Sequence, residues 1–233
     1  MIVILGAMDS EISAFVSQLQ ERETSYWNGF ERHRGRLAGH EVLVSKSGVG
    51  KVMAAMVTQR LIDEFAPRAL LFTGLAGSIN PAIDIGDTVI ARDLVQHDMD
   101  VAGLGFPRGQ IPFSHWRFLE SDAALLEKAR SFVPRQGKTH LGRICTGDQF
   151  ITHREMASHA YLTEELAGDA VEMEGASVAQ VCHVNGVPFL VARTISDRAD
   201  GSALVNFEEF LPIASHNSLD LVLHVLEQIP PAT

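Results

Sequence analysis

Short, unbroken runs of apolar residues that lead into amphipathic stretches recur along the chain, and they limit its possible folds more than any other feature. Residues 2–5 form such a run, which ends at Gly6 and precedes an amphipathic stretch from Met8 to about Leu19. Runs of this length predict buried strands, and the stretches that follow predict helices. Strands that alternate with helices predict an α/β fold with a largely parallel, twisted sheet covered on both faces. The same succession recurs at 41–65, at 68–78 and, with the helical stretch first, at 177–197.

The remaining segments complete one domain. Residues 86–98 and 138–148 have the pattern of further strands, 31–44 predicts a hairpin, and 208 to about 228 predicts a closing helix. No linker rich in Pro, Gly or Ser, no abrupt change of composition and no internal repeat divides the chain. We therefore expect residues 1–233 to form a single domain.

The composition argues against several classes of partner. Hydrophobic residues make up 46% of the chain and charged residues 21%, so a sizeable core can be buried. The formal net charge is −10 and the basic residues are scattered, which argues against nucleic acid as a partner. No apolar run approaches the roughly 20 residues that span a bilayer, so we expect no membrane partner, and the opening residues predict a buried strand rather than a signal peptide. Cys145 and Cys182 lack CxxC spacing, which predicts reduced thiols and a cytoplasmic location.

The sequence lacks the familiar motifs for phosphate loops, metal sites and serine nucleophiles. The segment SGVGK at 47–51 lacks the GxxxxGK[ST] spacing, so its glycines predict a tight turn between a strand and a helix. The histidines show no HExxH spacing, and QHDMD at 96–100 could contribute to a metal site only with ligands from elsewhere. No GxSxG segment is present. We therefore expect no metal.

Acidic residues at the ends of predicted strands remain as candidates for chemistry. Glu11 comes soon after the first strand, Glu172 and Glu174 stand in AVEMEGAS, and Asp197 directly follows Ser196 at the end of a buried run. In open α/β sheets the carboxyl ends of the strands converge on a ligand cleft. Two carboxyl groups with separated pKa values can hydrolyse a bond to a poor leaving group, because one activates water and the other protonates the leaving group. Glu11 and Asp197 suit these roles, although an acidic residue at a helix start and a turn or cap aspartate explain each of them in isolation.

The spacing of Glu172 and Glu174 leaves two local structures open. If a strand continues through both, their side chains share one face and Met173 faces the other. If a helix begins there, Glu174 lies in its first turn and points at the cleft. Glu174 and Met173 can form a ribose clamp, because a carboxylate accepts hydrogen bonds from vicinal hydroxyls and a thioether packs on a sugar ring. For Glu172 we favour a buried ion pair with Arg193 over direct contact with a ligand.

The chain resembles, nearly end to end, the 5′-methylthioadenosine/S-adenosylhomocysteine nucleosidases of the nucleoside phosphorylase superfamily. The segments that carry this likeness are GAMDSEI, KSGVGKV, GDQFI, VEMEGASVAQVCHVNGVPF and ARTISDRAD…FEEFL. The resemblance implies a three-layer α/β/α sandwich around a mixed, mostly parallel sheet, active as a homodimer without metal or cofactor. It also implies hydrolysis of the adenine N-glycosidic bond of a small-molecule nucleoside.

The resemblance also implies roles for individual residues. Glu11 resembles the group that orients the attacking water, and Asp197 resembles the acid that protonates the purine at N7, with Ser196 orienting it. Glu174 resembles the residue that binds the ribose 3′-hydroxyl. The other candidates for the ligand site are Phe150, which would stack on adenine, Ile151, whose backbone would read its edge, Met173 against the sugar, Phe207, which would close over the ligand, and Met8, Glu172 and Arg193.

The nucleophile separates the two activities found on this fold. A phosphorylase must hold a phosphate dianion, which favours Arg or Lys at the glycine-rich strand ends. This chain has GAMDSEI there, and an anion beside Glu11 would be repelled. Water is therefore the expected nucleophile. The alternatives are a phosphate-dependent purine nucleoside phosphorylase, a futalosine-type nucleosidase and a non-catalytic nucleoside-binding protein.

Two positions depart from the family pattern. Leu75 stands where a small hydroxyl residue is usual, which removes a hydrogen bond near the sugar or the water and could slow catalysis. Arg108 replaces an aromatic residue in the segment 104–113, which in the family lines the 5′-substituent pocket of the neighbouring subunit. A cation there could favour a substrate with a carboxylate-bearing 5′ group. An equal alternative is that Arg108 is an exposed loop residue with no role in specificity. The apolar character of this segment predicts a surface that needs a partner.

Overall fold

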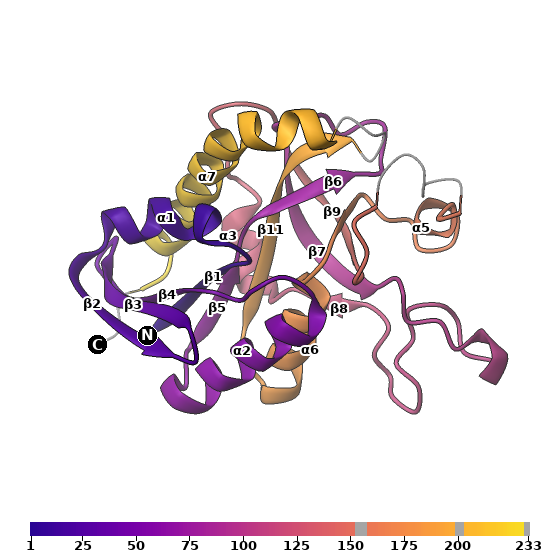
Figure 1. Ribbon diagram of the computed structural model, residues 1–233, viewed down its shortest axis with the longest axis horizontal. Coiled ribbons are helices and arrows are strands. Elements are labelled where there is room, and N and C mark those ends of the chain that lie inside the picture. Colours follow the sequence, from indigo (N-terminus) through magenta and orange to yellow (C-terminus); the bar gives the residue numbers. More distant parts are fainter. Residues whose placement is uncertain (152–157, 199–202, 231–233) are drawn as a thin grey trace.

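The computed structural model describes residues 1–151, 158–198 and 203–230, leaving aside the side chains of residues 203–209 (Figure 1). The strands are β1 (Ile2–Gly6), β2 (Gln20–Trp27), β3 (Phe30–Leu37), β4 (His40–Lys46), β5 (Ala69–Phe72), β6 (Leu75–Ser78), β7 (Thr88–Gln96), β8 (Leu119–Glu120), β9 (Thr139–Thr146), β10 (Ala170–Glu172) and β11 (Phe189–Arg198). The helices are α1 (Asp9–Gln18), α2 (Lys51–Phe65), α3 (Ala123–Ala129), α5 (Tyr161–Glu164), α6 (Gly175–Asn185) and α7 (Ala203–Glu227), with a short 3-10 helix η1 (Ala102–Leu104).

The sheet lies between two layers of helices, as the strand and helix pattern predicts (Figure 1). Alternate residues of β1 face opposite layers, so Ile2 and Ile4 pack with α1, α3 and α7, whereas Val3 and Leu5 pack with α2 and α6. A strand that is buried on both faces is apolar at every position, which explains the unbroken apolar runs. The central strands β4, β1, β5 and β11 pair in parallel, and the α/β sandwich with a mixed sheet is confirmed.

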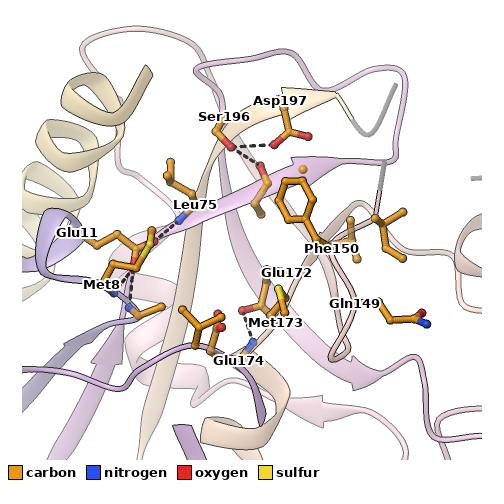
Figure 2. A pocket seen from close by; sticks show the side chains of 16 residues that line it. Met8, Glu11, Leu75, Gln149, Phe150, Glu172, Met173, Glu174, Ser196 and Asp197 are labelled. Carbon is orange, nitrogen blue, oxygen red and sulfur yellow. Dashed lines mark hydrogen bonds between the residues drawn. The ribbon is translucent and has the colours of Figure 1, made fainter. Parts of the chain in front are cut away.

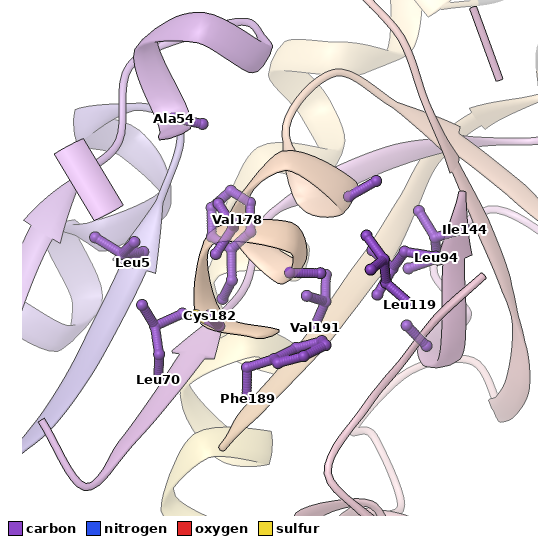
Figure 3. Packing of buried hydrophobic residues seen from close by; sticks show 14 of the residues in the cluster. Leu5, Ala54, Leu70, Leu94, Leu119, Ile144, Val178, Cys182, Phe189 and Val191 are labelled. Carbon is purple, nitrogen blue, oxygen red and sulfur yellow. The ribbon is translucent and has the colours of Figure 1, made fainter. Parts of the chain in front are cut away.

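The layer of α2 and α6 fixes the start of α6 against the sheet. Val178 and Cys182 of α6 are fully buried and belong to the same apolar cluster as Leu70, Phe189 and Val191 of the strands beneath (Figure 3). Each such side chain contributes about 1.5–3 kcal/mol of stabilisation relative to exposure. The core therefore holds the first turn of α6, and the acidic segment before it, in one place.

Strand β11 joins two parts of the sheet. Its first half pairs in parallel with β5, and its second half pairs in parallel with β6 and antiparallel with β7. The strand order is β2-β3-β4-β1-β5-β11-β6-β10-β9-β7-β8, and the extra β11–β7 pairing closes the second half of the sheet on itself. The end of β11 consequently lies among several other strand ends.

Three features of the fold differ from the sequence-based expectation. The run at 68–78 is interrupted after β5, where Gly74 has a φ of +155°, so it forms two strands rather than one. The closing helix α7 begins at Ala203 rather than near 208. Strand β2 was not expected, because it is an edge strand whose residues are exposed up to Trp27 and therefore lack an apolar pattern. The predicted hairpin is present as β3 and β4.

Cys145 and Cys182 are both buried free thiols, which confirms the prediction made from their spacing. In the part of the chain that the structure describes, no helix has the length and apolar character needed to cross a bilayer.

Candidate active site

A cavity of about 220 Å³ opens where the ends of several strands meet (Figure 2). It brings together Glu11, Glu172, Glu174 and Asp197, the acids that the sequence places at the ends of three different strands. Among the described residues, its lining consists of Ala7, Met8, Glu11, Val49, Leu75, Ala76, Gly77, Gln149, Phe150, Ile151, Val171, Glu172, Met173, Glu174, Ser196 and Asp197.

Glu11 is buried in the first turn of α1, directly after β1. Its Oε2 accepts hydrogen bonds from the backbone N–H groups of Ala7 at 2.5 Å and Met8 at 3.0 Å, and its Oε1 accepts one from Leu75 at 3.0 Å. Burial raises the pKa of Glu11, although the charge of Arg193 and these N–H groups oppose the shift. A carboxylate with a raised pKa is a stronger base, so Glu11 is suited to accept a proton.

The chain turns between Glu172 and Glu174, because β10 ends at the first and α6 begins just after the second. Glu174 is the N-cap residue of α6, so the helix alternative is confirmed and a strand running through both acids is wrong. Glu172 folds back on the helix start, where its Oε2 accepts from the N–H groups of Glu174 at 3.1 Å and Gly175 at 2.7 Å. The Oε1 of Glu174 reaches another helix and accepts from the Gly50 N–H, before α2, at 2.8 Å.

Arg193 on β11 neutralises Glu172 inside the core. Its Nη2 lies 2.5 Å from the Oε2 of Glu172, and its Nε donates to the same oxygen at 3.2 Å. The guanidinium also lies over the Phe72 ring at 4.0 Å and is 1% exposed. The predicted buried ion pair is thus confirmed, and Arg193 supports the cavity from behind without lining it.

One guanidinium serves three carboxylates at this point. Arg193 Nη2 is 3.8 Å from Glu174 Oε2, and its charge also acts on Glu11. Burial raises the pKa of Glu174 to about 7, the charge of Glu172 adds to the shift, and Arg193 opposes it. A Cβ atom at Gly74 would clash with both Arg193 Nη1 and Glu11 Oε1, so the absence of a side chain there lets the two charged groups approach each other.

Asp197 is buried on the other side of the cavity, at the end of β11 (Figure 2). Neighbouring strand residues normally face opposite sides of a sheet, but the β11–β6 register shifts between Ile195 and Asp197, and this bulge allows Ser196 and Asp197 both to line the cavity. Ser196 Oγ donates a hydrogen bond to Asp197 Oδ2 at 2.9 Å. A Cβ atom at Gly77 would lie 2.9 Å from Oδ1, so the absence of a side chain there leaves room for the Asp197 carboxyl group.

Apolar side chains form the wall between Glu174 and Asp197. Phe150 and Ile151 follow β9, Met173 follows β10, and all three line the cavity together with Met8. Phe150 is 55% exposed, so its ring stands at the cavity mouth, whereas Ile151 is buried. A planar apolar ligand can stack on such a ring. The remaining candidate, Phe207, lies in α7, and its side chain is outside the described residues.

Part of the cavity wall was missed by sequence reasoning. Val49 and Gln149 line it, as do Ala76 and Gly77 of β6. Val49 belongs to SGVGK, which was interpreted only as a tight turn. The signal that could have found these residues is their position, since each lies in or beside a glycine-containing segment at a predicted strand end.

Arg108 is neither a free cation nor an exposed loop residue. Its Nη2 lies 2.5 Å from Asp100 Oδ2, and its guanidinium lies 3.9 Å from the centre of the Tyr161 ring. Glu165 lies 3.7 Å from its Nε, and the side chain is 22% exposed. The expectation of an exposed arginine is therefore wrong, because two carboxylates and one ring of the same chain surround the charge.

Among residues 1–151, 158–198 and 203–230, no group of three or more His, Cys, Asp or Glu side chains could hold a metal ion. The QHDMD residues have other partners: His97 contacts Tyr161, Asp98 pairs with Lys51, and Asp100 pairs with Arg108.

Comparison with known proteins relates the chain to one superfamily. The phosphorylase superfamily matches residues 1–227. A 5′-methylthioadenosine/S-adenosylhomocysteine nucleosidase from Tolumonas auensis is 38% identical over 97% of this chain and 98% of its own. The crystal structure of such a nucleosidase from Colwellia psychrerythraea 34H, in complex with adenine, has a TM-score of 0.91 and 34% identity, covering 97% of this chain and 94% of the other. A futalosine hydrolase mutant of Helicobacter pylori has a TM-score of 0.90 and 35% identity, covering 98% and 99%.

Replacing Glu174 by Gln should change how stability depends on pH. The pKa of Glu174 rises from 4.5 to about 7 on folding, so between these values the folded chain binds the extra proton. A raised pKa contributes stability that is complete below the unfolded value and is lost as the pH rises through the folded value. The free energy of unfolding of the wild type, relative to Glu174→Gln, should therefore fall by about 3 kcal/mol between pH 4.5 and pH 8, as measured by urea unfolding.

The matched control is Glu127→Gln, because Glu127 is 71% exposed and lies far from the cavity. Its difference from the wild type should stay constant over the same pH range. Parallel stability curves for the wild type and Glu174→Gln would show that Glu174 does not hold a proton in the folded chain.

Proposed function

The chain belongs to the phosphorylase superfamily and, within it, to the family of the 5′-methylthioadenosine/S-adenosylhomocysteine nucleosidases, and on this basis we propose that it is an N-glycosyl hydrolase that releases adenine from 5′-substituted adenosines. One observation carries the proposal: Glu11 and Glu174 face Asp197 across an apolar cavity that no Lys or Arg of the described residues lines. The proposed substrates are 5′-methylthioadenosine and S-adenosylhomocysteine, which the names of the relatives give.

Asp197 is the acid that lets the base leave. Adenine departs as a poor anionic leaving group unless N7 is protonated while the glycosidic bond breaks through an oxocarbenium-like state. Ser196 donates to Oδ2 of Asp197 at 2.9 Å, which orients the carboxyl group for its role as the acid. Gly77 leaves room for that carboxyl group, because it has no side chain.

Glu11 is the base that activates water. Its burial raises its pKa, so it can take the proton of a water molecule as the anomeric carbon becomes positively charged. Leu75 contributes its backbone N–H to Glu11 at 3.0 Å but no side-chain hydroxyl. This difference bears on the rate of the reaction rather than on its type.

The remaining site residues hold the nucleoside between these two groups. Glu174 accepts a hydrogen bond from the ribose 3′-hydroxyl, and Met173 packs on the sugar. Phe150 stacks on adenine, and the backbone of Ile151 reads the edge of the base. In support, Met8 closes the sugar end, and Glu172 and Arg193 fix Glu174.

Water fits the cavity better than phosphate does. A phosphate dianion beside the sugar would meet Glu11, Glu172 and Glu174, and at an effective dielectric constant of 20 two unit charges 4 Å apart repel by about 4 kcal/mol. Arg193 is the cation behind these acids, and it already pairs with Glu172. The described lining of the cavity therefore lacks the positive charge that the phosphorylase alternative requires.

The direct test follows adenine release from 5′-methylthioadenosine with and without phosphate. Hydrolysis predicts the same rate in both buffers and free methylthioribose as the second product. Release that requires phosphate and forms the 1-phosphate sugar would show a phosphorylase instead, and binding without release would show a non-catalytic protein. A competition among methylthioadenosine, S-adenosylhomocysteine, 5′-deoxyadenosine and futalosine then ranks the 5′ groups.

Asp197→Asn and Glu11→Gln should each lower kcat by roughly 10² to 10⁴ fold, because each removes a proton transfer from the transition state. Steady-state rates of adenine release measure the loss. Glu127→Gln, at an exposed position, should retain the wild-type rate. Near-normal kcat in both cavity variants, with unchanged thermal unfolding, would contradict the assigned roles.

We also propose that the protein acts as a homodimer in which the segment 104–113 completes the cavity of the partner. The outer faces of α2 and α6 expose apolar side chains, among them Val52 and Val184 at 80% and 58% exposure. Phe113 is 91% exposed and has a φ of +59°, a conformation that bulky residues rarely adopt without a supporting contact. The segment does not line the cavity of its own chain.

The buried free thiols favour a reducing compartment, which supports a cytoplasmic location.

Val52→Glu should convert the dimer to monomers and lower activity, because a charge is placed in an apolar contact. We expect the dimer dissociation constant to rise at least about 100-fold, as measured by sedimentation at several concentrations. Val133→Glu is the matched control, since Val133 is 82% exposed near α3, away from α2 and α6. A wild-type protein that sediments as a monomer, or a Val52→Glu protein that remains dimeric, would contradict this arrangement.

A further inference from the structure

Asp98, within QHDMD, lies outside the cavity but connects two of its walls. Its Oδ1 is 2.6 Å from Lys51 Nζ, and its Oδ2 accepts a hydrogen bond from the Asp148 N–H at 3.0 Å. Asp148 in turn accepts the Lys51 backbone N–H on its Oδ1 at 2.8 Å. These three residues, the Asp98 clamp, therefore form a closed ring between the start of α2 and the turn that follows β9.

Each side of the Asp98 clamp carries residues of the cavity. On the α2 side, Val49 lines the cavity and the Gly50 N–H donates to Glu174 at 2.8 Å. On the β9 side, Gln149 and Phe150 directly follow Asp148 and line the cavity. The spacing between the Phe150 wall and the hydrogen-bond donor of Glu174 thus depends on contacts made by Asp98 and Asp148.

The contacts within the clamp are strong and partly shielded from water. The side chains of Lys51 and Asp98 are 17% and 23% exposed. Burial alone would raise the pKa of Asp98, but the Lys51 ammonium and the Asp148 N–H hold it below its usual value, so the carboxylate stays charged. Hydrogen bonds between charged groups are about twice as strong as those between neutral groups.

Asp148 also caps the start of α2. The residue before α2 is Gly50, with a φ of +89°, and it offers no side-chain cap to the first turn. The Asp148 carboxylate accepts one of the N–H groups that a helix start leaves free. Loss of the clamp would therefore loosen the start of α2 as well as the turn before Phe150.

We propose that Asp98 is a positioning residue, which fixes the Phe150 wall relative to the Val49 and Gly50 turn and thereby sets the affinity of the cavity for the adenine base. The inference rests on the proposed function, because adenine is the ligand of that wall. Asp98 touches neither the substrate nor the reacting atoms. The base occupies the same wall in the ground state and in the transition state, so weaker positioning raises KM while kcat changes little.

The test compares Asp98→Ala with the wild type in three measurements: kcat and KM for adenine release from 5′-methylthioadenosine, the Kd of free adenine by calorimetry, and Tm. Loss of the charge-assisted contacts should raise KM and the adenine Kd about tenfold each, with kcat within about threefold of the wild type. Asp98→Asn keeps an oxygen that can accept from one donor, so its KM and Kd should lie between those of the wild type and the Ala variant. The matched control is Asp220→Asn, which breaks an ion pair of another aspartate, with Arg135, and should leave KM and Kd unchanged.

The outcomes separate this inference from its alternatives. Unchanged KM and adenine Kd in Asp98→Ala would overturn it, and so would a fall in kcat and Tm at constant KM, which indicates a structural role alone. If the Ala variant does not fold, the Asn variant decides, because an unchanged KM and Kd at wild-type Tm also overturns the inference. If the wild type releases no adenine, the proposed function fails, and the adenine Kd of the same variants still tests the clamp.

Discussion

The buried ion pair between Arg193 and Glu172 is the interaction on which the rest of the site depends. Glu172 accepts hydrogen bonds from Thr146 Oγ1, from the N–H groups of Glu174 and Gly175 and from Arg193, so one carboxylate joins the ends of β9 and β10 and the middle of β11 to the start of α6. Removing one partner of such a pair leaves an uncompensated buried charge, at a cost of about 3–5 kcal/mol. The pair thus holds the strand ends in one arrangement, and the catalytic acids are placed relative to it.

The fold brings this pair together with Asp197 through the geometry of one strand. Strand β11 is fully buried until its last residue, carries Arg193 in its middle and ends just beyond Asp197. Its bulge before Asp197 turns two successive side chains to the cavity, whereas a regular strand would direct one of them into the opposite face. Arg193 therefore remains in the core behind the cavity, while Ser196 and Asp197, a few residues further along, line it.

Local patterns predicted the elements and the converging acids, and long-range contacts decided the details. Apolar runs identified β1, β4 and β11, and the strand-end rule grouped Glu11, Glu174 and Asp197. The break at Gly74 could not be predicted from the run at 68–78, because it results from the approach of Glu11 and Arg193 from other elements. The prediction that Arg108 is exposed was wrong for the same reason, since Asp100 and Glu165 come close to it only when the chain folds. The roles of Asp98 and Val49 depend on contacts between α2 and the turn after β9, which no local pattern contains.

The shortage of positive charge around the cavity connects its structure to its chemistry. Three carboxylates face one guanidinium, so they cannot all remain charged at low cost, and burial raises the pKa of both Glu11 and Glu174. A raised pKa makes Glu11 a better base for water, and the same negative surroundings disfavour a phosphate nucleophile. A second cation would stabilise the carboxylates, but it would also weaken the base and attract anions. Among the described residues around the cavity, Arg193 is thus sufficient to hold the acids together and insufficient to neutralise them, which is the condition that a neutral nucleophile requires.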